Sequence, residues 1–150
     1  MNLKEQIDAD IKKAMLGQKK DELRALRGIK SLILLAETEK GTGSGIDVTA
    51  EMQLLTKASK QRKESLEIYI NQGREDLAKI ERDELEVINR YLPKQLSETE
   101  LTEEISLIIS QIGALGPKDM GIVMGVATKK LAGKADGKTI AELVKKILIS

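Results

Sequence analysis

The chain has 150 residues, of which 33% are charged, and its formal net charge is only +1. It contains no cysteine and no histidine, which excludes disulfides, thiolate or imidazole metal sites and nucleophilic triads that need histidine. This length suits one domain or two small helical ones. The acid-containing amino terminus and the lack of a long apolar run lead us to expect a soluble, cytoplasmic protein with no membrane partner, metal or other cofactor.

The first part of the chain shows the 3.6-residue apolar period of amphipathic helices. One predicted helix begins at Leu3 and ends at Gly17, and a second runs from about 21 to 39. Within the second helix the segment SLILLA is apolar all round, so we expect it to be deeply packed. The glycine-rich stretch 41–45 is predicted to be a flexible linker, because Ile46 stands where a dinucleotide-binding loop needs a third glycine.

Two long helices are predicted to form the next hairpin. Thr49 caps the first, Gly73 separates the two, and Pro93 stops the second. Each helix carries one charged residue inside its apolar stripe, Arg62 on the first and Glu84 on the second. Both lie eleven residues from the glycine, so a chain that folds back there brings them face to face. We favour a structural ion pair that fixes the hairpin register over a functional site.

The rest of the chain is predicted to be a separate three-helix tail, which gives an amino-terminal domain over 1–93 and a tail domain over 94–150. Ser97 and Glu100 form a capping box that opens the first tail helix, and Gly113 closes it. We find no convincing strand, so the fold class is all-α with about seven helices. The last helix has one apolar face, made of Ile140, Leu143, Val144, Ile147 and Leu148.

The middle helix of the tail, which follows Pro117, carries glycines in its interior, where each costs about 1 kcal/mol against alanine. Gly121 and Gly125, with Thr128 and Ala132, form a strip of small residues that another backbone could approach closely. The strip is either a surface for a sugar-phosphate backbone or a close helix crossing inside the domain, and geometry alone favours neither. The lysines of the RNA-binding hypothesis are Lys118, Lys129, Lys130, Lys134 and Lys138.

The local charge of this tail is hidden by the balance of the whole chain. Residues 113–150 contain seven lysines against three acids, a net charge of +4. A helical surface with one basic side suits an RNA backbone or an acidic protein about equally well.

Several long, ungapped segments resemble the YqeY family, and together they extend over almost the entire chain: 55–69, 73–98, 112–125 and 133–138. The resemblance implies an all-helical protein whose three-helix tail is related to that of the B subunit of the glutamine-dependent Asp/Glu-tRNA amidotransferase. The tail residues that match the family motif are Asp119, Met120, Gly121, Met124, Gly125, Gly133, Lys134, Ala135, Asp136 and Gly137.

In that B subunit the related tail contacts tRNA, while a separate catalytic core forms the amide. The resemblance therefore implies an association with carbon–nitrogen ligase chemistry that uses glutamine as amide donor. This sequence lacks that core, so we expect no catalytic residue here. We expect an accessory protein whose carboxy-terminal helices bind tRNA or a tRNA-handling enzyme, with a protein–protein adaptor as the alternative. Ile122 stands where relatives commonly have lysine, which removes one potential phosphate contact. The oligomeric state stays open.

Overall fold

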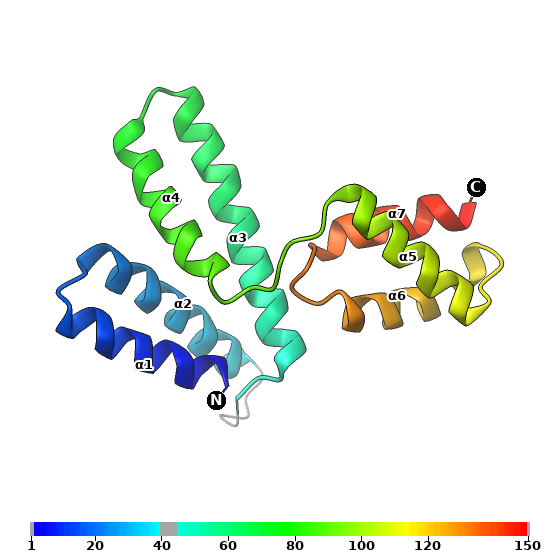
Figure 1. Ribbon diagram of the computed structural model, residues 1–150, viewed down its shortest axis with the longest axis horizontal. Helices are drawn as coiled ribbons and strands as arrows, with labels where there is room; N and C mark the ends of the chain where they lie inside the picture. The colour runs from blue at the N-terminus through cyan, green and yellow to red at the C-terminus, as the bar shows by residue number, and fades with distance from the viewer. Residues whose placement is uncertain (1, 40–44, 150) are drawn as a thin grey trace. The chain divides into compact units, whose positions relative to one another are not determined.

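The computed structural model describes residues 2–39 and 45–149, and in these ranges the protein consists of seven α-helices and one 3-10 turn, without a strand (Figure 1). The all-helical fold expected from the sequence is confirmed. The predicted linker over 41–45 lies outside the described residues except for Gly45. The elements are α1 (Leu3–Leu16), α2 (Lys20–Glu39), α3 (Val48–Asn71), α4 (Glu75–Asn89), α5 (Glu98–Ile112), η1 (Pro117–Asp119), α6 (Met120–Lys130) and α7 (Gly137–Ile149).

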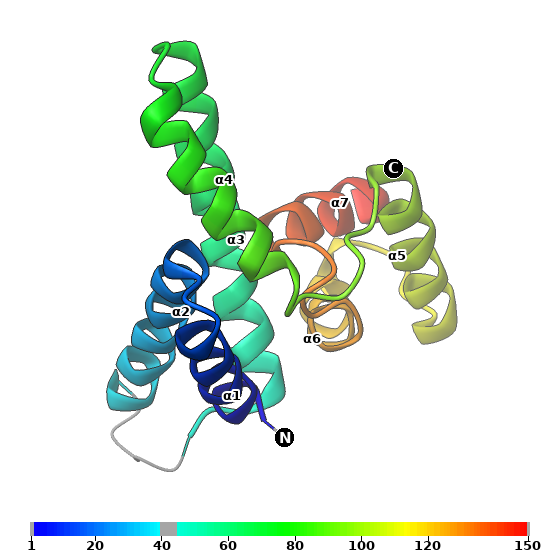
Figure 2. The same ribbon diagram turned by 60° about the vertical axis from the view of Figure 1, so that its left-hand side comes forward.

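The chain divides into two compact units, an amino-terminal unit (Met1–Pro93) and a carboxy-terminal unit (Lys94–Ser150). In the amino-terminal unit α1 packs along α2, α3 packs along α4, and α2 also packs against α4 (Figures 1 and 2). Two helical hairpins therefore share one core. The buried side chains of that core include Ile7, Leu26, Ile29, Ile33, Leu55 and Ile88.

The apolar segment of α2 is not deeply packed, contrary to the expectation from the sequence. Ile33 is 1% exposed, whereas Leu32, Leu34 and Leu35 are 37%, 42% and 57% exposed. The physical reason is that, among the described residues, the helices that pack against α2 are α1, α3 and α4, all on its buried side. A continuous apolar run shows that a helix can be buried all round, but it does not show how many neighbours the fold supplies.

The ends of the long hairpin differ slightly from the prediction. Asp47, not Thr49, is the N-cap of α3, and its Oδ1 accepts a hydrogen bond from the Ala50 N–H at 2.7 Å. Aspartate and threonine are both good N-caps, so the sequence offered two candidates two residues apart. The turn at Gly73 is present with a left-handed φ of +70°, a conformation that favours glycine. α4 ends at Asn89, and 90–92 continue as turns.

The carboxy-terminal unit packs α5, α6 and α7 around a second core. The predicted capping box of α5 is present, because Ser97 Oγ accepts from the Glu100 N–H and Glu100 Oε1 accepts from the Ser97 N–H, both at 3.2 Å. Gly113 ends the helix with φ +76°. The fully buried side chains of this core include Leu101, Ile105, Ile108, Val123, Leu131 and Val144.

Candidate functional site

The two interior glycines of α6 lie on its exposed face, opposite the buried Val123 and Ala127. A Cβ added at Gly121 or Gly125 would meet no heavy atom within 4 Å. We call these two residues the glycine face of α6. In the part of the chain that the structure describes, no neighbouring segment occupies this face, so the close helix crossing is not what is found. Gly121 and Gly125 are therefore exposed on the surface of the carboxy-terminal unit.

Two lysines flank the glycine face. Lys118 lies in η1, just before α6, and Lys129 lies near the end of α6, and both are exposed. Lys118 precedes α6 by two residues and Lys129 follows Gly125 by four residues, so the two lysines bracket the glycines along the chain. The face thus combines a close approach to the helix backbone with one ammonium group near each end.

The other lysines of the hypothesis have different surroundings. Lys130 Nζ donates to Gln111 Oε1 at 3.4 Å, so this side chain lies toward α5 rather than over the glycine face. The Lys134 side chain is half-buried, and its backbone carbonyl accepts from the Leu96 N–H at 3.0 Å. Lys138 is exposed in the first turn of α7.

Several residues of the family motif form structural hydrogen bonds in the turns before and after α6. Asp119 Oδ2 accepts from the Leu115 N–H at 2.9 Å and closes the turn before the helix. Asp136 Oδ1 accepts from the N–H groups of Lys138 and Thr139 at 2.9 and 3.1 Å, and thereby caps α7, which begins at Gly137. These hydrogen bonds give Asp119 and Asp136 a structural role, so their presence in the motif needs no ligand to explain it.

The remaining motif residues pack or bend the chain. Gly133 has φ +79°, a left-handed conformation, and its carbonyl accepts from the side-chain amide of Gln95 at 2.6 Å. Met120 and Met124 are half-buried against the core of the unit. The glycine face is therefore the part of the motif that these folding contacts leave unexplained.

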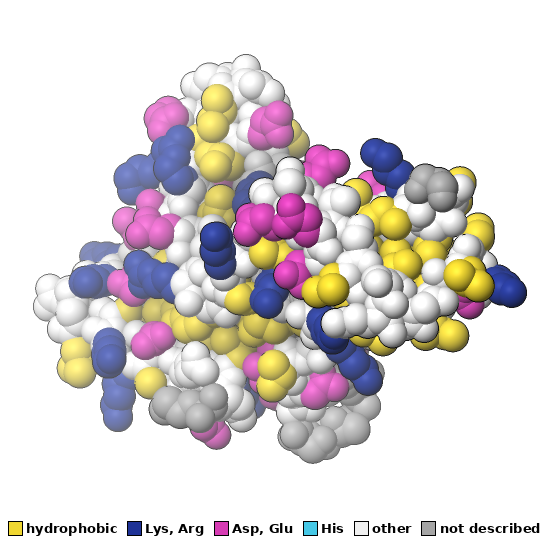
Figure 3. Space-filling model, turned by 45° about the vertical axis from the view of Figure 1, so that its right-hand side comes forward, with side chains coloured by type: hydrophobic (Ala, Val, Ile, Leu, Met, Phe, Trp, Pro, Cys, Tyr) yellow, Lys and Arg dark blue, Asp and Glu magenta, His cyan; other side chains and the backbone are white. Residues whose placement is uncertain are grey.

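Large apolar side chains also reach the surface of the carboxy-terminal unit. Leu115 is 90% exposed, Ile122 is 61% exposed and Leu107 is 53% exposed. On the side seen in Figure 3, apolar side chains show on both units, and basic and acidic side chains are interspersed over the amino-terminal unit. The amino-terminal unit thus presents no field of one sign on that side.

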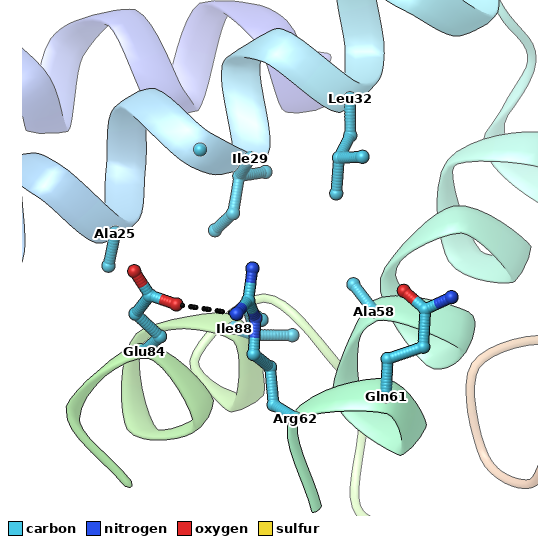
Figure 4. Close-up of a pocket in the computed structure, with 9 residues that line it drawn as sticks. Ala25, Ile29, Leu32, Ala58, Gln61, Arg62, Glu84 and Ile88 are labelled. Carbon is cyan, nitrogen blue, oxygen red and sulfur yellow. Dashed lines mark ion pairs between the residues drawn. The ribbon is translucent and has the colours of Figure 1, made fainter. Parts of the chain in front are cut away.

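In the amino-terminal unit the predicted pairing of the long hairpin is present. Arg62 Nη1 lies 3.1 Å from Glu84 Oε2 (Figure 4). The same nitrogen donates to both oxygens of Glu81 at 3.2 and 3.1 Å, and Arg24 Nε of α2 lies 3.5 Å from Glu84 Oε1. Glu81 was not predicted from the sequence, although it lies one helical turn before Glu84 on the same face of α4.

A buried acid connects α3 to the start of α1. The Glu51 side chain is almost fully enclosed, and burial raises the pKa of its carboxyl. The Leu3 N–H donates to it and lowers the pKa, while the nearby Asp47 raises it again. The carboxyl thus satisfies a free N–H in the first turn of α1 at the cost of a buried negative charge.

Over residues 2–39 and 45–149, no helix has the length and apolarity needed to cross a bilayer. In the same ranges, no three acidic side chains gather closely enough to hold a metal ion.

The comparison with protein families gives a match over nearly the whole chain. Residues 4–148 match the family described as "Yqey-like protein". The chain belongs to the YqeY-like family. Curated relatives of this YqeY-like protein include fungal proteins named "Altered inheritance of mitochondria protein 41, mitochondrial". That of Lachancea thermotolerans is 32% identical over 147 residues, which are 93% of this chain and 75% of the relative.

Two further fungal relatives match shorter parts. The protein of Clavispora lusitaniae is 31% identical over 110 residues, 72% of this chain and 63% of its own length. That of Meyerozyma guilliermondii is 37% identical over 83 residues, 55% of this chain and 42% of its own length. The name places these relatives in mitochondria and gives no biochemical activity.

Proposed function

We propose that this YqeY-like protein is an accessory protein whose carboxy-terminal unit binds the sugar-phosphate backbone of RNA, with tRNA as its ligand. The observation that carries the proposal is the open glycine face of α6, where added Cβ atoms at Gly121 and Gly125 would meet nothing within 4 Å. Exposed Lys118 and Lys129 flank it. The resemblance of this tail to the tRNA-contacting tail of the amidotransferase B subunit supports tRNA over other RNA.

The chemistry of the site fits backbone contact without reading of sequence. Glycine lets a phosphate approach the helix closely, and each lysine neutralises a phosphate and releases counterions. The chain has no phenylalanine or tryptophan, and both of its tyrosines, Tyr69 and Tyr91, lie in the amino-terminal unit, so the carboxy-terminal unit has no aromatic ring on which a base could stack. Affinity should therefore come from charge and fall as salt rises.

A tRNA titration followed by fluorescence anisotropy at several salt concentrations tests the proposal. We expect the logarithm of the binding constant to fall linearly with the logarithm of salt concentration. The double variant Lys118→Ala, Lys129→Ala should flatten that slope by about 1.4–1.8, because two phosphate contacts are lost. Lys12→Ala with Lys57→Ala changes the net charge equally in the exposed part of the amino-terminal unit and should leave the slope almost unchanged. Equal slopes for the two double variants would show that the glycine face is not the binding surface.

The exposed apolar residues favour a second candidate, a protein–protein adaptor. Leu115 and Ile122 are 90% and 61% exposed in the same unit as the basic residues. An acidic protein with an apolar patch would use both features. In that case the tRNA titration shows no saturable binding, and the variant Leu115→Ser, Ile122→Ser loses a partner that the wild-type protein captures from cell extract.

The proposal assigns no catalytic step to this chain. Glutamine-dependent amide formation on tRNA is a carbon–nitrogen ligase reaction. We propose that this chain is linked to it through a tRNA-handling enzyme that binds the same tRNA. The cytoplasmic location expected from the sequence is also part of the proposal, and the fungal relatives differ from it by name. Fractionation of cells that carry a tagged copy of this chain tests the location.

A further inference from the structure

A small pocket of about 130 Å³ lies in the amino-terminal unit, where α2 meets the α3–α4 hairpin (Figure 4). This volume is several times that of a water molecule. Ala25, Ile29 and Leu32 of α2 form one apolar wall, and Ala58 and Ile88 of the hairpin form another. The pocket thus combines apolar walls with polar groups and has room for a short aliphatic chain.

The polar side of the pocket is the guanidinium of Arg62. All of its contacts with described residues use the Nη1 atom, which binds Glu81 and Glu84. Figure 4 shows the guanidinium rising from α3 between Glu84 and Gln61 toward Ile29. The two glutamates therefore bind Nη1 of the guanidinium, and the N–H groups of Nη2 and Nε stay available to the pocket.

The carboxylates around Arg62 already have arginine partners. Glu84 is shared between Arg62 and Arg24, Glu81 pairs with Arg62, and Arg24 also pairs with Asp21 at 3.3 Å. At the pocket, the remaining edge of Arg62 offers N–H donors, and Gln61 offers an amide donor and an amide acceptor. An acceptor with a negative charge suits these donors, whereas an amine would have to compete with two arginines for the same carboxylates.

Gly28 is the residue of the pocket lining at which a larger side chain can be introduced. It lies in the interior of α2, lines the pocket, and has no heavy atom within 4 Å of an added Cβ. Packing therefore does not require glycine here, although glycine is among the poorest helix formers. Because Gly28 lines the pocket, we expect a leucine side chain at this position to compete with a ligand for it.

We infer that this pocket binds a free monocarboxylic acid with a short branched aliphatic tail. The carboxylate accepts N–H donors from Nη2 and Nε of Arg62, in the side-by-side geometry typical of arginine with carboxylates. The tail lies against Ala25, Ile29 and Leu32 and covers part of their apolar surface. A phosphate would leave part of its charge against these apolar walls, so a single carboxylate is the better match.

Isovalerate tests this inference, with isovaleramide as its uncharged analogue of the same shape. We expect amide NMR spectra of the full chain to show saturable shifts with isovalerate at residues around Ile29 and Arg62, at constant ionic strength. Isovaleramide should bind at least about tenfold more weakly, because it cannot form charge-assisted bonds. Gly28→Leu should abolish the shifts while the thermal melt shows a folded protein. Arg62→Lys should weaken binding about tenfold or more, whereas Arg82→Lys, at an exposed pair with Glu75, should leave it unchanged.

Three results would overturn the inference: no saturable shifts in the wild-type protein, equal binding of acid and amide, or unchanged binding by a folded Gly28→Leu variant. If Arg62→Lys fails to fold, the Gly28→Leu comparison decides alone.

Discussion

Replacement of Arg62 by alanine should destabilise the amino-terminal unit through the acids it leaves behind. The side chains of Glu81 and Glu84 are only 10% and 14% exposed, while that of Arg62 is 41% exposed. Removal of one partner of a fully buried pair costs about 3–5 kcal/mol, and loss of an exposed pair costs about 0–1 kcal/mol. This cluster lies between these limits, because Glu84 keeps Arg24 at 3.5 Å. We therefore expect Arg62→Ala to lower the free energy of unfolding by about 2 kcal/mol.

A urea melt followed by far-ultraviolet circular dichroism measures this loss. Lys63→Ala is the matched control, since Lys63 is the exposed neighbour of Arg62 on the same helix. It should cost less than about 0.5 kcal/mol, the range of ordinary surface substitutions. The two units can unfold separately, so the unfolding transition of the amino-terminal unit must be identified. Tyrosine fluorescence does this, because the two tyrosines of the chain, Tyr69 and Tyr91, both lie in that unit. Equal effects of the two substitutions would refute the reasoning about the buried acids.

Four further outcomes follow from the structure. Gly125→Ala should stabilise the carboxy-terminal unit by about 0.5–1 kcal/mol yet weaken tRNA binding, and a destabilised variant would show that the face is packed. Ile122→Lys should steepen the salt dependence of tRNA binding by about 0.7–0.9, and an unchanged slope would place the phosphates elsewhere. Ser97→Ala should cost about 1 kcal/mol in a thermal melt, and no loss would make the capping box energetically neutral. The fourth, Glu51→Gln, concerns pH. Because the pKa of Glu51 is raised in the folded protein, its contribution to stability is present below pH 4.5 and is lost as pH rises through the pKa of the native state. In urea melts the free energy of unfolding of the variant should therefore rise relative to that of the wild type between about pH 4 and pH 7. A difference that does not change with pH would contradict this.

The sequence was most informative where a few neighbouring residues determine the local structure. The capping box at Ser97 and the turn at Gly73 depend on local hydrogen bonds and backbone conformation, and both appear where they were predicted. The pairing of Arg62 with Glu84 also followed from periodicity and from their equal distance to the turn. The third member, Glu81, needed knowledge of how the two helices rotate against each other, which the apolar stripe alone does not supply.

The sequence was least informative where the outcome depends on neighbours. The apolar run of α2 predicted burial for Leu34 and Leu35, but in the described part of the chain both side chains are exposed. Likewise, the small residues of α6 fit an open face or a helix crossing equally well, because both need the same close approach. Only the arrangement of α5 and α7 around the opposite side of α6 shows that Gly121 and Gly125 are exposed.

A titration of ¹⁵N-labelled full chain with tRNA, observed through its amide NMR signals, tests the central claim most directly. The account predicts that shifts and broadening concentrate between Lys118 and Lys129 and disappear at high salt. Perturbations confined to the amino-terminal unit, or none at concentrations where a known RNA-binding protein is saturated, would contradict it.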